Sequence, residues 1–165
     1  MTLALCLAVV LPAVGLAALW VRRGFLATTV HGTSMEPTLR PGDRLLVRRT
    51  RRVRAGQVVV FRYSAPSGSS ATAHDEDPVP GRDGALLIKR AVAVPGERVR
   101  DEWEQPDVHH MAGTVVPPGS LVVLGDNRAT SWDSRHYGLV SGDRFIGVAI
   151  RRLGAGPTPL PGSGS

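Results

Sequence analysis

The chain contains a single lysine. Of its 20 Lys and Arg residues, only Lys89 is a lysine. An arginine side chain stays charged in a protein, whereas a buried lysine can lose its proton and act as a base. Lys89 lies in an apolar run, Ala85–Val94, where desolvation would lower its pKa. Lys89 is therefore a candidate general base, and the structural alternative is a lysine that extends its amine to solvent from a strand end.

A candidate nucleophile, Ser34, follows Gly32 and Thr33. A serine on a tight turn is accessible, and the neighbouring N–H groups can converge on an oxyanion. The segment is not a G-x-S-x-G elbow, because Glu36 occupies the position of the second glycine. Taken alone, an ordinary turn is the more common interpretation of such a segment. A neutral Lys89 within hydrogen-bond reach would make Ser34 a nucleophile.

A third segment, Gly125–Gly138, contains polar side chains of several kinds. Asp133 and Arg135 are spaced to pair across a bend, and the Ser131 hydroxyl could hold a neighbouring amine. Such groups support a reactive pair by fixing its orientation.

Two other chemistries remain open at this point. A Ser34–His136–Asp133 triad can be drawn, but it leaves the lone lysine unexplained. Metal binding is weakly indicated, because adjacent loop residues rarely close a coordination shell; the candidate groups are His109–His110 with Asp107, and His74 with Asp75 and Asp77. The single cysteine, Cys6, excludes a disulfide framework or a cysteine-based metal site within one chain.

Short strands must position these residues. Runs rich in β-branched and apolar residues, separated by turn signals, predict an all-β, barrel-like domain. The polar stretches Ser64–Gly84 and Asp101–Gly113 are expected to be surface loops. The expected strands are Thr28–Val30, Leu45–Val47, Gln57–Tyr63, Ala85–Val94, Leu121–Leu124 and Phe145–Leu153.

The N-terminus has the pattern of a membrane anchor. Leu3–Val21 is a run of 19 residues without charge, followed by Arg22 and Arg23. That length can cross a bilayer core of about 30 Å, and no basic region precedes it as in a cleaved signal peptide. We expect one transmembrane helix in residues 1–23, a catalytic domain in 24–153 and a disordered Pro/Gly/Ser-rich tail in 154–165.

The formal charge of +6 fits anionic lipid and nucleic acid equally well. The best nucleic-acid candidate is the cluster Arg48–Arg54, but no stretch alternates basic and aromatic residues. A solvated strand edge or a lipid-facing rim is the favoured interpretation, and no nucleic-acid partner is expected.

Three segments in this order resemble the bacterial type I signal peptidase family. "GTSMEPTLRPGD" is similar to its nucleophile box, "IKRAVAVPGE" to its lysine box, and "LGDNRATSWDSRHYGLV" to its last box. The trailing "FIGVAI" is similar to its closing strand. The resemblance covers roughly Thr28 to Ile150, which is most of the chain after the expected anchor.

The resemblance implies a role for each matched position. It implies a mostly β, partly open barrel, no metal and no cofactor, and removal of signal peptides after small residues at the −1 and −3 positions. Preproteins, the lipid bilayer and the translocation machinery are the implied partners. By position, the implied residues are Ser34 as nucleophile, Lys89 as general base, Ser131 orienting that lysine, Asp133 and Arg135 as a bracing ion pair, and Met35 beside the substrate cleft.

The sequence departs from the family at the oxyanion hole. Some members place a serine hydroxyl two residues before the nucleophile, where this chain has Gly32. The hole would then use backbone N–H groups, chiefly that of Ser34, with help from Thr33.

Two further points stay open. The family is implied to act on the outer face of the cytoplasmic membrane, whereas the positive-inside rule applied to Arg22 and Arg23 predicts the reverse orientation. A maturation protease dedicated to one precursor, or a membrane-tethered β module without catalysis, are alternatives to a general signal peptidase. A self-cleaving repressor fits poorly, because no DNA-binding region is evident.

Overall fold

The computed structural model describes residues 12, 14–16, 22–63, 84–100 and 111–154. Most of the expected anchor, most of the tail and most of the two expected surface loops fall outside these residues. In the described part of the chain, no helix is long and apolar enough to cross a bilayer. The elements are β1 (Phe25–Thr29), β2 (Arg44–Arg48), β3 (Val58–Arg62), β4 (Leu86–Ala93), β5 (Ser120–Leu124), α2 (Ser134–Tyr137), β6 (Val140–Ser141) and β7 (Phe145–Leu153).

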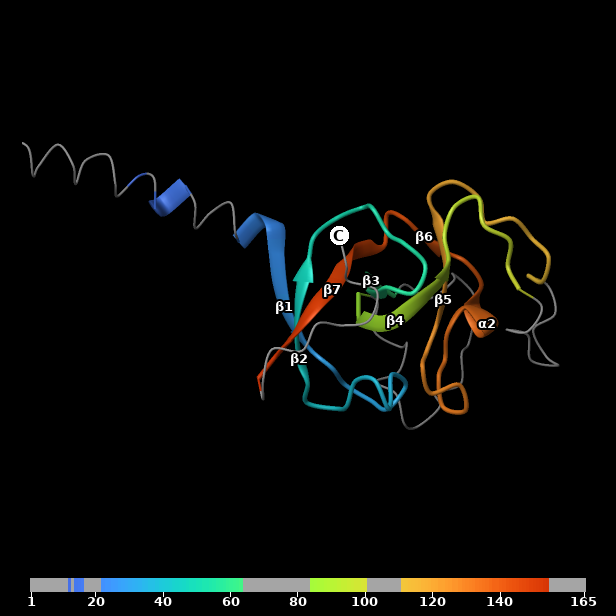
Figure 1. The fold of residues 1–165 in the computed structure, drawn as a ribbon, viewed down its shortest axis with the longest axis horizontal. Coiled ribbons are helices and arrows are strands. Elements are labelled where there is room, and N and C mark those ends of the chain that lie inside the picture. Colours follow the sequence, from blue (N-terminus) through green and yellow to red (C-terminus); the bar gives the residue numbers. More distant parts are fainter. Residues whose placement is uncertain (1–11, 13, 17–21, 64–83, 101–110, 155–165) are drawn as a thin grey trace, which may run out of the picture.

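The strands form one antiparallel sheet in the order β1-β2-β7-β3-β4-β5-β6. The last strand, β7, therefore lies between β2 and β3. Register shifts interrupt the β2–β7, β3–β7 and β4–β5 pairings, and such irregularities bend and twist strands. The sheet is curled with two open edges (Figure 1). The prediction of a mostly β, partly open barrel-like domain is confirmed.

All six expected strands are present, with one change at the first. The expected start at Thr28 is wrong, because β1 begins at Phe25 and pairs with β2 along its whole length, from Phe25 opposite Arg48 to Thr29 opposite Arg44. The two-residue strand β6 and the one-turn helix α2 were not expected, since neither carries a periodic pattern long enough to be recognised.

Apolar side chains cover both faces of the sheet. On β3, Val58 and Val60 belong to one buried cluster, whereas Val59 and Phe61 belong to another. This division follows from the alternation of side chains along a strand. The first cluster also takes in Val30, Met35 and Leu39 from the connection between β1 and β2. That connection carries Ser34, so the core itself holds the candidate nucleophile in place.

Candidate active site

The segment that carries Ser34 is fixed at both ends and in the middle. At its ends, the Val30 N–H donates to the Asp43 carbonyl at 2.8 Å, and the Gly42 N–H donates to the Val30 carbonyl at 3.0 Å. In its middle, Met35 and Leu39 are 1% and 0% exposed. Apolar residues spaced through a Gly- and Pro-containing loop thus anchor it to the sheet. Ser34 itself is buried between these anchors.

Lys89 lies on β4 and is 1% exposed. Its Nζ donates to the Ser131 Oγ at 3.1 Å, and Ser131 is also buried. The hydroxyl of Ser131 in turn hydrogen-bonds the Asp133 carboxylate. The amine is therefore held by a short chain of polar groups inside an otherwise apolar region.

Asp133 and Arg135 form a buried ion pair. The Arg135 Nε lies 2.8 Å from Asp133 Oδ1, and its Nη2 lies 3.0 Å from Oδ2. The Gly125 N–H also donates to Oδ2 at 2.9 Å. Burial acts to raise the pKa of Asp133, but the hydrogen bonds from Arg135, Gly125 and Ser131 outweigh it and hold that pKa below its usual value.

A second ion pair, between Arg90 and Asp126, was not predicted from the sequence. The Arg90 Nε and Nη2 lie 2.7 and 2.5 Å from the two Asp126 oxygens, and Nη1 donates to the Gly56 carbonyl at 2.7 Å. Asp126 also hydrogen-bonds the side chain of Thr38, in the segment that carries Ser34. Burial acts to raise the pKa of Asp126. The hydrogen bonds from Arg90 and Thr38 together outweigh this effect and hold that pKa below its usual value. The pair joins β4, the Ser34 segment and the connection after β5.

Two connections meet at the candidate site. The Asn127 N–H donates to the Ser34 carbonyl at 3.0 Å, and its Nδ2 lies 3.4 Å from the Thr33 carbonyl. In Figure 1 the connection before β2 and the connection after β5 lie at the same end of the sheet. Gly32 has a positive φ of 78°, a conformation that glycine adopts at no steric cost. Within the described residues, the N–H groups of Thr33 and Ser34 donate to no backbone carbonyl.

A small cavity of about 30 Å³ connects the candidate nucleophile with the candidate base. Ser34, Met35 and Lys89 all line it. Its other lining residues come from the end of β1 and the start of β4, and most are apolar: Thr29, Val30, His31, Leu86, Leu87 and Ile88. The structure therefore brings Ser34, Met35 and Lys89 to one cavity, with Ser131, Asp133 and Arg135 behind the lysine.

Comparison with known proteins identifies a family for this chain. The family model described as signal peptidase, peptidase S26, matches residues 3–105 and 101–153. The chain belongs to this signal peptidase family. It is 30% identical over 146 residues to a probable signal peptidase I-2 of Synechocystis, covering 77% of this chain and 62% of that protein. It is 28% identical over 180 residues to signal peptidase IB of Staphylococcus aureus, covering 86% of this chain and 85% of that protein.

In this signal peptidase family member, His136 has a local structural role. Its Nδ1 accepts the Asp133 N–H at 3.2 Å and lies 4.0 Å from Asp133 Oδ1. This contact caps α2, and the imidazole stacks on Trp132. In a Ser-His-Asp triad that nitrogen would instead donate to the carboxylate, so the geometry speaks against the triad. Among described residues no group of three potential metal ligands occurs, and both candidate groups around His74 and His109 lie outside them.

Gly125 is a site residue that the sequence pattern did not indicate, and its close contacts predict the effect of adding a side chain there. A Cβ at this position would lie 2.1 Å from Ser131 Oγ and 2.6 Å from the Ser34 carbonyl oxygen. We expect Gly125→Ala to push these two groups apart and to lower kcat about 10²-fold, as small misplacements of reacting groups do. Peptide-bond cleavage kinetics with a preprotein would measure this. Gly24→Ala is the matched control, because nothing lies within 4 Å of its Cβ; equal activity of the two variants would contradict the prediction.

Asp133 makes the stability of this signal peptidase family member depend on pH. Its folded pKa lies below the unfolded value of about 3.9. Between these two values the unfolded state binds more protons, so the contribution to stability is complete above about pH 5 and is lost as the pH falls through the folded pKa. At pH 7, Asp133→Asn should cost about 3–5 kcal/mol, because Arg135 would remain buried without its partner.

Thermal unfolding at several pH values would test this. The gap in Tm between wild type and Asp133→Asn should be large at pH 7 and should narrow under acidic conditions. Asp143→Asn is the control, since its carboxylate is exposed and its loss should change Tm much less. A difference in Tm between wild type and Asp133→Asn that stays constant down to the lowest pH would contradict the lowered pKa of Asp133.

Proposed function

We propose that this protein is a membrane-bound serine endopeptidase that removes N-terminal signal peptides from exported preproteins. The observation that carries the proposal is the buried Lys89, bonded to Ser131 and lining one cavity with Ser34. Membership of the signal peptidase family supports the same activity. Ser34 would be the nucleophile and Lys89 the general base.

The reaction follows from the chemistry of these two groups. Burial disfavours a charged amine, which supports a neutral Lys89 that accepts the proton of the Ser34 hydroxyl. The Ser34 oxygen attacks the substrate carbonyl, and the resulting oxyanion accepts hydrogen bonds from the backbone N–H groups of Ser34 and Thr33. The Lys89 ammonium then protonates the leaving amine as the peptide bond breaks. Lys89 next takes a proton from water, whose oxygen attacks the acyl-enzyme. As the ester bond breaks, the Lys89 ammonium returns that proton to the Ser34 oxygen, which restores the serine and the neutral lysine.

Residues behind Lys89 would hold it for this work. The Ser131 hydroxyl orients the amine of Lys89. Asp133 hydrogen-bonds the same hydroxyl, and Arg135 donates to the Ser131 carbonyl at 3.3 Å. The Asp133–Arg135 pair would thus fix the position of Ser131. Gly32, with no side chain, cannot supply the hydroxyl that some relatives use at this position. The oxyanion hole of this chain would therefore consist of backbone donors. In other enzymes, removing one oxyanion-hole donor raises the activation free energy by about 3–4 kcal/mol.

The size of the cavity supports a preference for small residues at the cleavage site. A volume of about 30 Å³ beside Ser34, walled by Met35 and β-strand side chains, leaves room for little more than a methyl group or one water molecule. An extended substrate is proposed to pair along the cleft as an added strand, which presents alternate side chains to such cavities. Alanine-like residues would fit there and larger ones would clash.

Attachment to the cytoplasmic membrane belongs to the same proposal. Residues 1–23 would form a single anchor, 24–153 the extracytoplasmic catalytic domain, and 154–165 a tail. The anchor would hold the catalytic domain where the apolar segment of a preprotein also lies, which raises their effective concentration. The translocation machinery would deliver such substrates.

The proposal is tested by incubating the purified full chain in lipid with several preproteins and mapping the new N-terminus by mass spectrometry. We expect one cut after a small residue in each, and loss of that cut when the −1 residue is changed from Ala to Leu. Cleavage of a single precursor from the panel would indicate a dedicated maturation protease instead. Intact substrates throughout, with a folded protein, would refute peptidase activity.

A further inference from the structure

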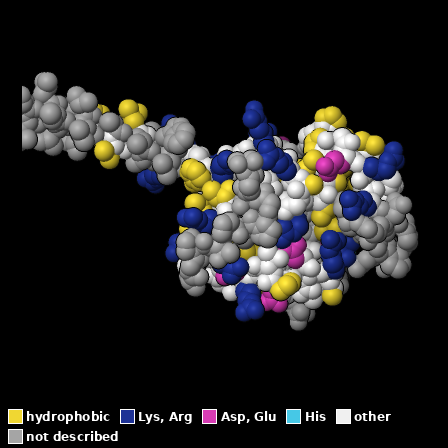
Figure 2. All heavy atoms as spheres, in the orientation of Figure 1, with side chains coloured by type: hydrophobic (Ala, Val, Ile, Leu, Met, Phe, Trp, Pro, Cys, Tyr) yellow, Lys and Arg dark blue, Asp and Glu magenta, His cyan; other side chains and the backbone are white. Residues whose placement is uncertain are grey.

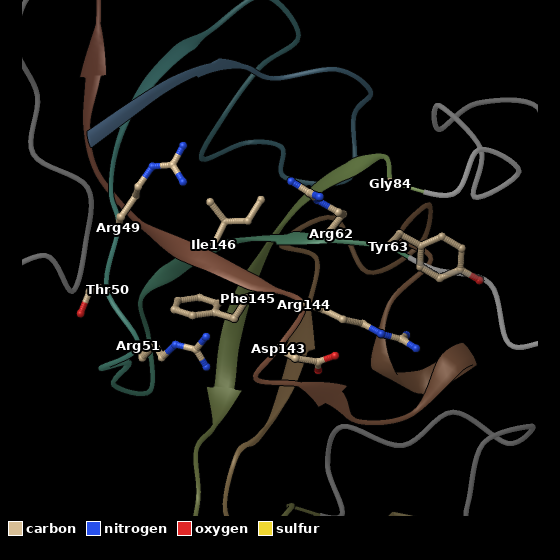
Figure 3. Close-up of a pocket in the computed structure, with 10 residues that line it drawn as sticks. All are labelled: Arg49, Thr50, Arg51, Arg62, Tyr63, Gly84, Asp143, Arg144, Phe145 and Ile146. Carbon is tan, nitrogen blue, oxygen red and sulfur yellow. The ribbon is translucent and has the colours of Figure 1, made fainter. Parts of the chain in front are cut away.

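A second, larger hollow lies away from the Ser34 cavity. It has a volume of about 930 Å³, at the upper end of the 300–1,000 Å³ typical of small-molecule sites. It lies between the segment after β2 and the start of β7, and Figure 3 shows the side chains around it. We call it the basic groove, because its walls include the four arginines Arg49, Arg51, Arg62 and Arg144.

The charge of the basic groove is strongly one-sided. Four arginines and one carboxylate, Asp143, give its described lining a net charge of +3. Among the described residues, none of the ion pairs involves the side chains of Arg49, Arg51 or Arg62. All three are exposed. Guanidinium groups are well suited to phosphate, which they bind through two parallel hydrogen bonds.

The basic groove also has an apolar part. Phe145 and Ile146, at the start of β7, are half-buried and line it. In Figure 3 the side chain of Ile146 lies between those of Arg49 and Arg62, and the guanidinium of Arg51 lies beside Phe145. Positive charge next to partly exposed apolar surface is the combination that an amphiphile with a phosphate group requires.

The basic groove lies where the chain would leave a membrane. The Arg49 N–H donates to the Gly24 carbonyl at 2.8 Å, so this wall of the groove contacts the residue that follows Arg22 and Arg23. The uncharged run Leu3–Val21 precedes them directly. Figure 2 shows one face of the molecule, on which Lys and Arg side chains outnumber those of Asp and Glu. An anionic bilayer surface attracts such arginines over roughly one Debye length.

We propose that the basic groove binds the phosphate of an anionic phospholipid headgroup. Arg49, Arg51 and Arg62 contact the phosphate oxygens, and Phe145 and Ile146 contact the glycerol and the first carbons of the acyl chains. The inference rests on the proposed membrane attachment and adds to it, because an anchor alone needs no particular headgroup. A bound lipid would fix how the domain is tilted on the bilayer.

The test uses the full chain in nanodiscs of phosphatidylcholine, without or with increasing phosphatidylglycerol. Hydrogen–deuterium exchange is followed in peptides covering residues 49–53 and 144–147. The groove variant is Arg49→Ala with Arg51→Ala. The matched control is Arg44→Ala with Arg151→Ala, which removes two exposed arginines from the other end of β1 and β2, where Arg44 lies opposite Thr29.

Phosphatidylglycerol should slow exchange in both peptides of the wild type and of the control variant. Since each arginine near an anionic surface contributes about a fivefold factor, the groove variant should need roughly 25-fold more of the lipid for the same protection. An equal response of the groove variant and the wild type would overturn the proposal. The proposal would also be overturned if the control variant lost as much phosphatidylglycerol-dependent protection as the groove variant. Protection by free glycerol phosphate in phosphatidylcholine nanodiscs would assign the groove to a soluble phosphate ester instead.

Co-elution with nanodiscs separates this inference from the proposed anchor. A chain that co-elutes with pure phosphatidylcholine nanodiscs but shows no headgroup effect retains the anchor and lacks the lipid site. A chain that co-elutes only when phosphatidylglycerol is present, and only with Arg49 and Arg51 intact, has the lipid site and lacks the anchor.

Discussion

Replacement of Ser34 by alanine is expected to lower preprotein cleavage by at least about 10⁴-fold, since loss of the nucleophile removes the whole covalent pathway. The change deletes one oxygen from a buried side chain, so the fold should persist. Single-turnover cleavage of a preprotein, followed by gel or mass spectrometry, measures the effect. KM should change little, because the substrate backbone still pairs along the same cleft.

The control for this result is Ser141→Ala, which removes the same hydroxyl from an exposed residue at the end of β6. It should cleave at the wild-type rate. Thermal unfolding of both variants would show that neither has lost its fold. Cleavage by Ser34→Ala at a rate near wild type would show that another residue is the nucleophile, and the mechanism proposed above would be wrong.

Replacement of Lys89 by methionine should have the second largest effect, a loss of about 10³-fold or more in kcat. Methionine is unbranched and of similar length, so it can fill the same space, but it cannot accept a proton. Lys89→Arg keeps nitrogen donors yet stays charged at any accessible pH. We therefore expect both variants to be inactive, although arginine introduces a permanent charge at a position that is 1% exposed and should also lower Tm.

The methionine variant keeps this prediction testable even if the arginine variant fails to fold. His136→Ala is the comparison, because His136 caps α2 and would be the base of the alternative triad. It should retain most activity and lose some stability. Full activity of Lys89→Arg, or complete loss in His136→Ala with an unchanged Tm, would replace the dyad by the triad.

Most of the fold could be predicted from local sequence patterns. The runs over β3, β4 and β7 are mostly apolar, and each of their bounds lies within one residue of the expected one. Lys89 and Ser34 could be proposed because their chemistry is unusual in its context: a lone lysine in an apolar strand and a serine after glycine. The curl of the sheet follows less directly, since it depends on register shifts that no local pattern encodes.

Other features of the site depend on which distant segments meet. Arg90 bonds Asp126, which lies 36 residues away, and nothing near either residue marks the other as its partner. Gly125 looks like an ordinary turn glycine until the Ser131 hydroxyl and the Ser34 carbonyl are placed beside it. The helix α2 is one turn long and depends on a cap between Asp133 and His136. Each needed the folded arrangement before its role could be assigned.

The position of β7 between β2 and β3 has a consequence for when the enzyme becomes able to act. During synthesis β2 and β3 emerge long before β7, yet each must pair with it in the finished sheet. The Ser34 segment shares this dependence, because Arg152 on β7 donates to the Thr38 carbonyl at 3.1 Å. In a nascent chain the Ser34 segment therefore lacks this bond until β7 has been made. The strand order therefore delays completion of the candidate site until β7 has paired with β2 and β3.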